Sequence, residues 1–357
     1  DDADDRAAVR GDEAQRSAGA RLLQQRLERV FWQYGLIPAR ALRGGLGQAP
    51  LPLRQCREQR LPWMLLLPHS PCMAGRRVDR AARIEDGQLR IGKAAVSTLH
   101  AARHLVEADD AREEDGIRRY CHLATGNYNG STAKIYTDIG LMTADNEIGV
   151  DGSRFFNFLS GFSDPPAWNK LIVAPLNLRE TIMAEIDQEI EHAKRGERAY
   201  IAAKMNSLLD RLIIAKLYEA SAAGVKIDLI VRGICVLRPG LPEISENIHV
   251  RSIVGRFLEH SRILYCYNGG REDVFISSAD WMPRNLNNRV ELMIPIREQD
   301  HKDRLHAILQ TYLKDNTKAY LMRSDGSYVR ASCRKGMTPI GAQKTFMETA
   351  LSGKTLG

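Results

Sequence analysis

The sequence predicts an α/β protein in which short apolar strands alternate with amphipathic helices. Residues 200–231 are predicted as a strand, a helix and a strand in succession, which is the pattern of a β-α-β unit. An Asn-Gly step near residue 268 separates two β-rich runs, as in a hairpin, and residues 301–313 repeat apolar side chains at helical spacing. The 357 residues fit two or three domains, and a hydrophobic content of 44% is enough for buried cores.

Each element is predicted from apolar residues that recur with the period of a strand or of a helix. In chain order, the predicted strands are Ile117–Leu123, Leu171–Pro175, Tyr200–Lys204, Val225–Val231, Ile248–Arg251, Ile263–Tyr267, Asp273–Ser277 and Arg289–Ile296. The predicted helices are Leu178–Arg195, Leu208–Ala223, Ser252–Leu258 and His301–Leu313.

Helix starts are predicted from residues that can accept hydrogen bonds from the free N–H groups of a first turn. Asn177, with Glu180 three residues later, is predicted to cap the helix over 178–195. Asn206 is predicted to cap the helix over 208–223. A glycine directly follows each of these two helices, as is common at helix C-termini.

Three segments differ from this regular pattern. Residues 1–112 are rich in arginine but have no sustained periodicity, so they are poorly suited to form a core. The aromatic cluster Phe155–Phe162 is predicted to pack in a core or between domains. The tail from Ser327 is polar and basic, and we expect it to be solvated or loosely packed.

The charge balance indicates a polyanionic partner, because the net charge is +7 and the pI is about 9.1. Nucleic acid, polyphosphate and anionic lipid all fit this charge. The six cysteines include no Cys-x-x-Cys pair, which argues against a zinc site and a disulfide framework. No apolar run has transmembrane length and the acidic start is not a signal peptide, so a cytoplasmic protein is expected.

Polar residues that suit phosphate chemistry gather at predicted strand ends. The hairpin brings His260 and Arg262 close to the residues just past its second strand, namely Ser278, Asp280, Arg284 and Asn285. Imidazole can act as a nucleophile or move a proton near neutral pH, and guanidinium matches the geometry of phosphate oxygens. Arg232 follows a buried strand, where ligands commonly bind in such sheets.

A second small-residue loop, at 124–129, follows its strand as the loop after Ser277 follows the second hairpin strand. The two loops are therefore interpreted as matching parts of an internal duplication. Its side-chain amides, Asn127 and Asn129, are candidates for holding phosphate oxygens.

Six motifs in combination closely resemble the C-terminal half of polyphosphate kinase: ATGNYN, KIYTD, KMNSL, VRG, FLEHSR and SSADWMPRN. The resemblance covers about residues 113–330. It implies two phospholipase-D-like αβα domains, of which the first is incomplete and is preceded by the atypical arginine-rich segment. The domains implied are an atypical segment over 1–112, the remainder of the first domain over 113–176, and the second domain over 177–357.

The resemblance also implies a reaction: reversible transfer of the terminal phosphate of ATP to polyphosphate through a phosphohistidine, with Mg²⁺. It implies that His260 is catalytic and that Tyr136, Arg232 and His260 bind ATP. Phosphate contacts are expected at Asn127, Asn129, Arg262, Ser278 and Arg284, with no protein ligand assigned to a metal. Expected partners are polyphosphate and ATP or ADP, and no nucleic acid. A homo-oligomer and peripheral membrane association are further expectations from the family.

The family places its nucleophilic histidine in a Lys-Thr-His-x-Lys segment upstream of Tyr120, and residues 1–112 contain no such segment. The nearest histidines are His100 and His104, and His104 is interpreted as a surface helix residue. Loss of the nucleophile from a covalent mechanism is expected to lower the rate by many orders of magnitude.

Two alternative functions stay open. One is a non-catalytic protein that binds ATP or polyphosphate. The other is a phospholipase-D-like phosphodiesterase, which would need two His-x-Lys motifs where this site has His260-Ser261-Arg262.

Overall fold

A mixed sheet of nine strands is the largest element of the computed structural model, which describes residues 82–85, 88–91, 106–113, 116–126, 128, 131–160, 167–353 and 356. The chain divides into two units, Asp1–Arg77 and Val78–Gly357, and every described residue belongs to the second. Across the sheet the strands are β16 (Tyr328–Arg330), β15 (Ala319–Met322), β10 (Ile248–Ile253), β9 (Lys226–Val231), β8 (Tyr200–Met205), β12 (Arg262–Cys266), β13 (Asp273–Ser277), β14 (Glu291–Ile296) and β7 (Ile172–Ala174).

The centre of this sheet forms as the sequence predicts. Strands β8, β9 and β10 are parallel, with Tyr200 opposite Lys226, and the helix α5 (Arg211–Ala222) connects β8 to β9. Strands β12 and β13 pair as the predicted antiparallel hairpin, with Arg262 opposite Ser277. At its turn, Gly269 has a φ of 65°, which glycine adopts without strain.

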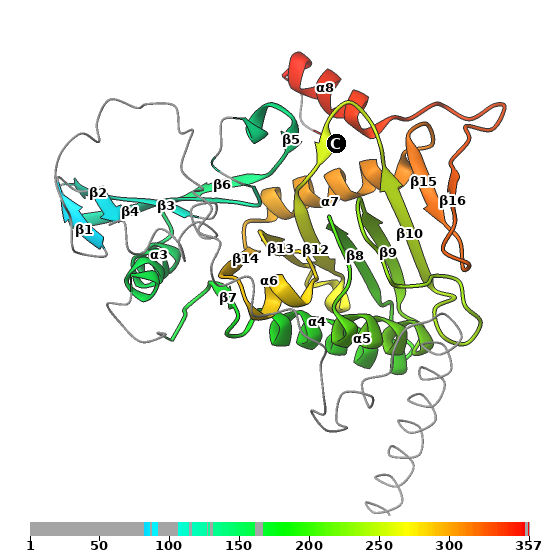
Figure 1. Cartoon of the computed structure of the whole chain (residues 1–357), viewed down its shortest axis with the longest axis horizontal. Helices are drawn as coiled ribbons and strands as arrows, with labels where there is room; N and C mark the ends of the chain where they lie inside the picture. Colours follow the sequence, from blue (N-terminus) through cyan, green and yellow to red (C-terminus); the bar gives the residue numbers. More distant parts are fainter. Residues whose placement is uncertain are drawn as a thin grey trace, which may run out of the picture. The chain divides into compact units, whose positions relative to one another are not determined.

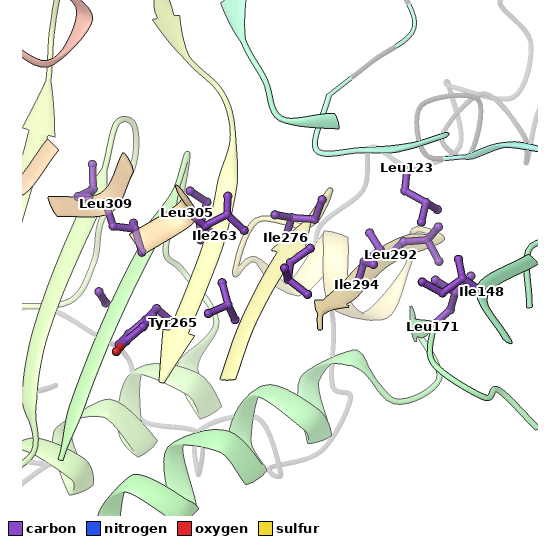
Figure 2. Packing of buried hydrophobic residues seen from close by; sticks show 14 of the residues in the cluster. Leu123, Ile148, Leu171, Ile263, Tyr265, Ile276, Leu292, Ile294, Leu305 and Leu309 are labelled. Atoms are coloured by element: carbon purple, nitrogen blue, oxygen red, sulfur yellow. The ribbon is translucent and has the colours of Figure 1, made fainter. Parts of the chain in front are cut away.

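Helices cover both faces of the sheet, as the predicted αβα arrangement requires. The helices α4 (Leu178–Lys194) and α5 lie side by side on one face, and α7 (Gln299–Lys314) lies on the other (Figure 1). Leu305 and Leu309 of α7 pack in a core with Ile263 and Tyr265 of β12 (Figure 2). Two further helices are α6 (Pro283–Asn287) and α8 (Ala342–Ser352).

A second sheet is formed by the residues before 144. In order it contains β1 (Ala82–Glu85), β2 (Gln88–Ile91), β3 (Val106–Glu113), β4 (Gly116–Ala124) and β6 (Gly140–Thr143), and every pair in it is antiparallel. Strand β3 crosses the predicted boundary at residue 112 and pairs with β4 along its whole length. The helix α3 (Asn146–Leu159) buries Phe155 and Phe156, which confirms the predicted core role of this part of the aromatic cluster.

A two-stranded parallel sheet joins segments that are far apart in the sequence. Strand β5 (Tyr136–Thr137) pairs with β11 (Leu258–Glu259), and a 3₁₀ turn over Thr132–Lys134 precedes β5. No helix among the described residues is long and apolar enough to cross a membrane.

The predicted helix Ser252–Leu258 is wrong. Its first two residues continue β10, where they pair with β15, and its last residue belongs to β11. The local pattern of apolar residues could not show that this segment forms strands, because the partner strands β15 and β5 come from distant parts of the sequence. Ile253 is buried between neighbouring strands, which suits a β-branched side chain.

Both predicted helix caps need correction. The α5 helix starts three residues later than predicted, and Asp210 is its cap, accepting from the N–H groups of Leu212 and Ile213 at 3.1 Å each. Asn177 does precede α4, but its side chain accepts from the N–H of Val173 and makes no capping bond. Asn206 is instead part of the candidate site described below.

The tail is more regular than predicted. Strand β16 pairs with β15, and α8 forms the end of the described chain. The polar composition was a correct sign of exposure, because all three residues of β16 are exposed and Ala342 is the one buried residue of α8. The tail is regular because it forms hydrogen bonds with the rest of the domain. For example, the N–H of Ala342 donates to the carboxylate of Asp315 at 2.7 Å.

Candidate functional site

His260 lies where the chain leaves β11, directly beside β5. The N–H groups of His260 and Ser261 both donate to the carbonyl of Thr137, at 3.2 and 2.9 Å. This register brings the Tyr136 ring next to the imidazole, with ring centroids 4.5 Å apart and a tilt of 44°. The parallel pairing of β5 with β11 therefore sets the distance between these two predicted ATP contacts.

Asp138, two residues after Tyr136, makes an ion-pair contact with the imidazole. Its Oδ1 and Oδ2 lie 2.9 and 3.1 Å from Nδ1 of His260, and its Oδ1 also accepts from the hydroxyl of Thr125 at 2.9 Å. Burial by itself would raise the pKa of Asp138, but the hydrogen bonds from His260 and Thr125 and the charges of His260 and Arg262 outweigh it and lower this pKa. Asp138 is therefore an ionised acceptor at neutral pH.

The contact with Asp138 determines which ring nitrogen of His260 carries the proton in the neutral imidazole. An ionised Asp138 can only accept, so Nδ1 must donate to it. The Nη1 of Arg262 lies 3.2 Å from both ring nitrogens and does not distinguish between them. The Asp138 contact therefore assigns the proton to Nδ1 and leaves the lone pair on Nε2.

Arg262 joins the loops that follow two different strands. Its Nε and Nη2 donate to the two carboxylate oxygens of Asp280 at 3.2 Å each, and its Nη1 donates to the carbonyl of Thr125 at 2.9 Å. Burial would raise the pKa of Asp280. The charge and hydrogen bonds of Arg262, together with the hydrogen bonds from Asn206, outweigh burial and lower this pKa. The loop after β4 and the loop after β13, predicted to be matching parts, thus meet on one guanidinium group.

Asn206 connects Arg232 to this group. Its Oδ1 accepts from Nε and Nη2 of Arg232 at 3.0 and 2.7 Å, and its Nδ2 donates to Oδ1 of Asp280 at 3.1 Å and to the carbonyl of His260 at 3.3 Å. The Nε of Arg232 also donates to the carbonyl of Glu259 at 2.8 Å. Arg232 is half-buried, and its Nη1 makes no hydrogen bond to any residue that the structure describes.

The structure therefore brings Tyr136, Arg232, His260 and Arg262 into one network of contacts. Ser278 lies deeper: its hydroxyl donates to Glu291 at 2.6 Å and accepts from the N–H of Leu292 at 3.0 Å. Arg284 is exposed on α6. Asn127 and Asn129 lie outside the described residues, as do His100 and His104. The roles of all these residues stay predictions.

Three residues of the network were missed by sequence reasoning. Asp138 had a usable signal, because it follows Tyr136 by two positions in the KIYTD motif and such residues share one side of an extended segment. Thr125 and Asn206 gave only ambiguous signals, since small polar residues are also common in turns and helix caps. Asp280 was recognised as a neighbour of the site, but not as the partner of Arg262.

The residues present favour binding of a phosphate chain. They combine guanidinium groups, an imidazole with a free lone pair and an adjacent aromatic ring. Among the described residues, no group of three or more His, Cys, Asp or Glu side chains could hold a metal ion. The carboxylates of Asp138 and Asp280 already bind His260 and Arg262.

Comparison with known proteins gives two adjoining family matches. Residues 171–343 match the model described as polyphosphate kinase C-terminal domain 2, and residues 81–165 match polyphosphate kinase C-terminal domain 1. The second match begins at residue 81, upstream of the segment near residue 113 where the motif resemblance starts.

Individual relatives agree with the family matches. The chain is 54% identical over 236 residues to a polyphosphate kinase of Halalkalibacterium halodurans, which covers 66% of this chain and 34% of the relative. It is 50% identical over 244 residues to one of Synechocystis sp., covering 68% and 34%. The crystal structure of polyphosphate kinase from Porphyromonas gingivalis superposes with a TM-score of 0.65 at 42% identity, covering 70% of this chain and 38% of that one. The α/β fold class is thereby confirmed, and the chain spans about a third of the length of these curated relatives.

Proposed function

This chain belongs to the polyphosphate kinase family, and we propose that its site binds ATP and inorganic polyphosphate for phosphoryl transfer between them. In the net reaction the bond between the terminal phosphorus of ATP and its bridging oxygen breaks, a bond to the terminal oxygen of polyphosphate forms, and ADP leaves. In the covalent form expected for the family, the phosphoryl group passes through a histidine nitrogen. The observation that carries the proposal is the network in which Tyr136, Arg232, His260 and Arg262 lie together.

Each residue has a role that follows from its contacts. Arg232 has one guanidinium nitrogen free of the described residues, so it can donate to a phosphate oxygen. Arg262 is held in place by Asp280 and adds a fixed positive charge near the transferred group. His260 offers the Nε2 lone pair, which can accept a proton, and Tyr136 can contact the nucleotide through its ring.

Mg²⁺ is proposed to enter with the nucleotide, where it would neutralise charge on the phosphates. Mg²⁺ is commonly held by substrate phosphates and water together with one or two carboxylates. The described acidic residues of the site are engaged by His260 and Arg262, so they fit poorly as dedicated metal ligands.

A second candidate function is binding of ATP or polyphosphate without transfer. It is favoured by one observation: the 357 residues contain no Lys-Thr-His-x-Lys segment. The same site geometry serves both functions, so only an assay of transfer distinguishes them.

Binding is tested by titrating the full chain with ATP and Mg²⁺, and separately with polyphosphate. We expect Arg232→Gln to weaken both by about 10-fold or more, because a charge-assisted hydrogen bond contributes roughly 1.5–3 kcal/mol. Arg304→Gln is the matched control: it removes the same charge from an exposed position on α7 and should change binding less than about twofold. Absence of ATP and polyphosphate binding to the unmodified chain would refute the proposal.

Transfer is tested with ATP labelled in its terminal phosphate. Appearance of label in polyphosphate supports the kinase, and acid-labile, base-stable label on the protein identifies a phosphohistidine intermediate. Binding without either product supports the second candidate.

A further inference from the structure

The carboxylate of Glu259, the residue before His260, is buried and receives hydrogen bonds from several elements. Its side chain is 1% exposed. Its Oε2 accepts from the hydroxyls of Thr137 at 3.2 Å and Tyr312 at 2.5 Å and lies 3.2 Å from Nζ of Lys204, while its Oε1 accepts from Nε2 of Gln343 at 2.8 Å. These four partners come from β5, α7, β8 and α8.

This arrangement fixes both neighbours of the imidazole. The ammonium group of Lys204 also donates to the hydroxyl and carbonyl of Ser261, at 2.9 and 3.2 Å, so the residues before and after His260 share one buried cation. Burial lowers the pKa of Lys204, although the charge of Glu259 opposes this shift. Breaking such a buried pair leaves an uncompensated charge, which is much costlier than losing a surface ion pair.

Gln343 holds the same segment from its other side. Its Oε1 accepts from the N–H of Phe257 at 3.0 Å and its Nε2 donates to the carbonyl of Phe257 at 2.9 Å, so a side-chain amide pairs with this backbone as a neighbouring strand would. The same Nε2 donates to Glu259. A glutamate at this position could not donate to either acceptor and would add a carboxylate beside Glu259.

Glu259 acts on the site through position and not through contact with substrate, because its side chain is sealed from solvent. It bonds to Thr137, which lies between Tyr136 and Asp138, and it directly precedes His260. The carboxylate therefore ties the strand that carries the tyrosine and the acid to the strand that carries the imidazole.

We propose that Glu259 is a positioning residue that holds His260 against Tyr136 and Asp138, and that α8 is part of the site because Gln343 completes the set of donors around this carboxylate. The role rests on the proposed function only for its effect on nucleotide binding. The geometry it predicts can be tested without any ligand.

The test uses Gln343→Ala in the full chain, with Glu348→Ala on the exposed side of α8 as control. The first readout is the NMR cross-peak between the rings of Tyr136 and His260, whose centroids are 4.5 Å apart. We expect it to weaken at least twofold in Gln343→Ala and to stay unchanged in the control. The thermal unfolding midpoint should fall in Gln343→Ala, because its hydrogen bonds to Phe257 and Glu259 are lost, and it should stay unchanged in the control, so the cross-peak is compared at a temperature where both variants are folded.

The second readout is affinity for ATP with Mg²⁺, which should fall about three- to tenfold in Gln343→Ala. Should Gln343→Ala fold poorly, Gln343→Glu keeps the aliphatic stem and is expected to weaken the same cross-peak. A normal cross-peak in a folded variant overturns the positioning role. If the unmodified chain shows the cross-peak but does not bind ATP, the proposed function fails and the inference about geometry is still decided by the first readout.

Discussion

The imidazole of His260 lies between a group that can only accept hydrogen bonds and a group that can only donate them. Asp138 and Arg262 are both fixed by further partners, Thr125 and Asp280 respectively. The orientation and the tautomer of the ring are therefore set before any ligand arrives. Preorganisation of this kind favours stabilisation of charge in a transition state, because no groups need to reorient during the reaction.

Asp138→Asn tests this assignment. In the unmodified protein, ¹⁵N NMR should show the neutral His260 ring protonated at Nδ1, because the ionised carboxylate requires a donor. The variant should contain a substantial share of the Nε2-protonated form, since an amide can also donate. If phosphoryl transfer is detected, its rate should fall about 10²-fold. Asp325→Asn, an exposed carboxylate in the turn between β15 and β16, serves as control. A ring protonated at Nε2 in the unmodified protein would contradict the assignment.

The carboxyl group of Glu185 is buried, and one of its oxygens lacks a hydrogen-bond partner among the described residues. Glu185 on α4 is 9% exposed, and its Oε2 is buried with no hydrogen-bond partner among the described residues. Burial, followed by the charge of Asp273, raises its pKa from 4.5 to about 7. The folded state therefore keeps a proton that the unfolded chain loses between these two pH values, and stability must fall as pH rises through this range.

Replacement of Glu185 by Gln removes this titration. We expect Glu185→Gln to leave the free energy of unfolding nearly unchanged at pH 4.5 and to raise it by about 1–2 kcal/mol at pH 8. Urea unfolding at several pH values measures the slope. Glu180→Gln, an exposed carboxylate on the same helix, should keep the slope of the unmodified protein. An identical slope in Glu185→Gln would show that this carboxyl is ionised in the fold.

The carboxylate at the start of α5 serves two purposes. Asp210 accepts from two N–H groups of the first turn and also from Nη2 of Arg179 on α4 at 2.9 Å. One carboxylate thus caps α5 and joins the two helices that cover one face of the sheet. Because Asp210 caps α5, the side-chain amide of Asn206 can form hydrogen bonds with the carbonyl of His260 and with Arg232.

Two substitutions separate these purposes of Asp210. Asp210→Ala loses the cap and the ion pair and should lower the free energy of unfolding by about 2–3 kcal/mol. Asp210→Asn can still accept from the first turn, so it should lose about 1 kcal/mol less. Chemical unfolding followed by circular dichroism measures both. Equal losses would mean that capping contributes little here.

The pairing of β5 with β11 is the smallest sheet in the part of the chain that the structure describes, yet it sets the geometry of the site. Its two strands are separated by more than a hundred residues, and each contributes two residues to the pairing. Such short strands have too little local signal to be recognised from periodicity. The neighbouring contacts from Glu259 and Gln343 supply the stability that two residues of strand cannot.

One hydrophobic core connects the large sheet, α7 and α3. It runs from Leu309 of α7 through Ile263 and Ile276 to Leu292 and Ile148 (Figure 2). Because protein interiors are close-packed, removal of a side chain from this core leaves a cavity that the surroundings only partly fill.

Leu309→Ala should therefore be strongly destabilising. Leu309 is fully buried, and we expect a loss of about 2–5 kcal/mol in the free energy of unfolding. Leu321→Ala, at a position 42% exposed on β15, should cost less than about 1 kcal/mol. The midpoints of urea unfolding compare the two. Equal midpoints would place Leu309 outside the cooperative core.

The α/β class, most of the strands and the helices α4, α5 and α7 could be predicted from the sequence, because each depends on a local period of apolar residues. The sequence also indicated Tyr136, Arg232, His260 and Arg262, since the motifs around them are specific and lie at strand ends. The contacts of Asp138 with His260, of Asn206 with Arg232 and Asp280, and of Gln343 with Glu259 became visible only in the folded chain. These contacts link residues up to 122 positions apart in the sequence, so they leave no local pattern. A local sequence pattern does not predict which distant donor will form a hydrogen bond with a buried carboxylate.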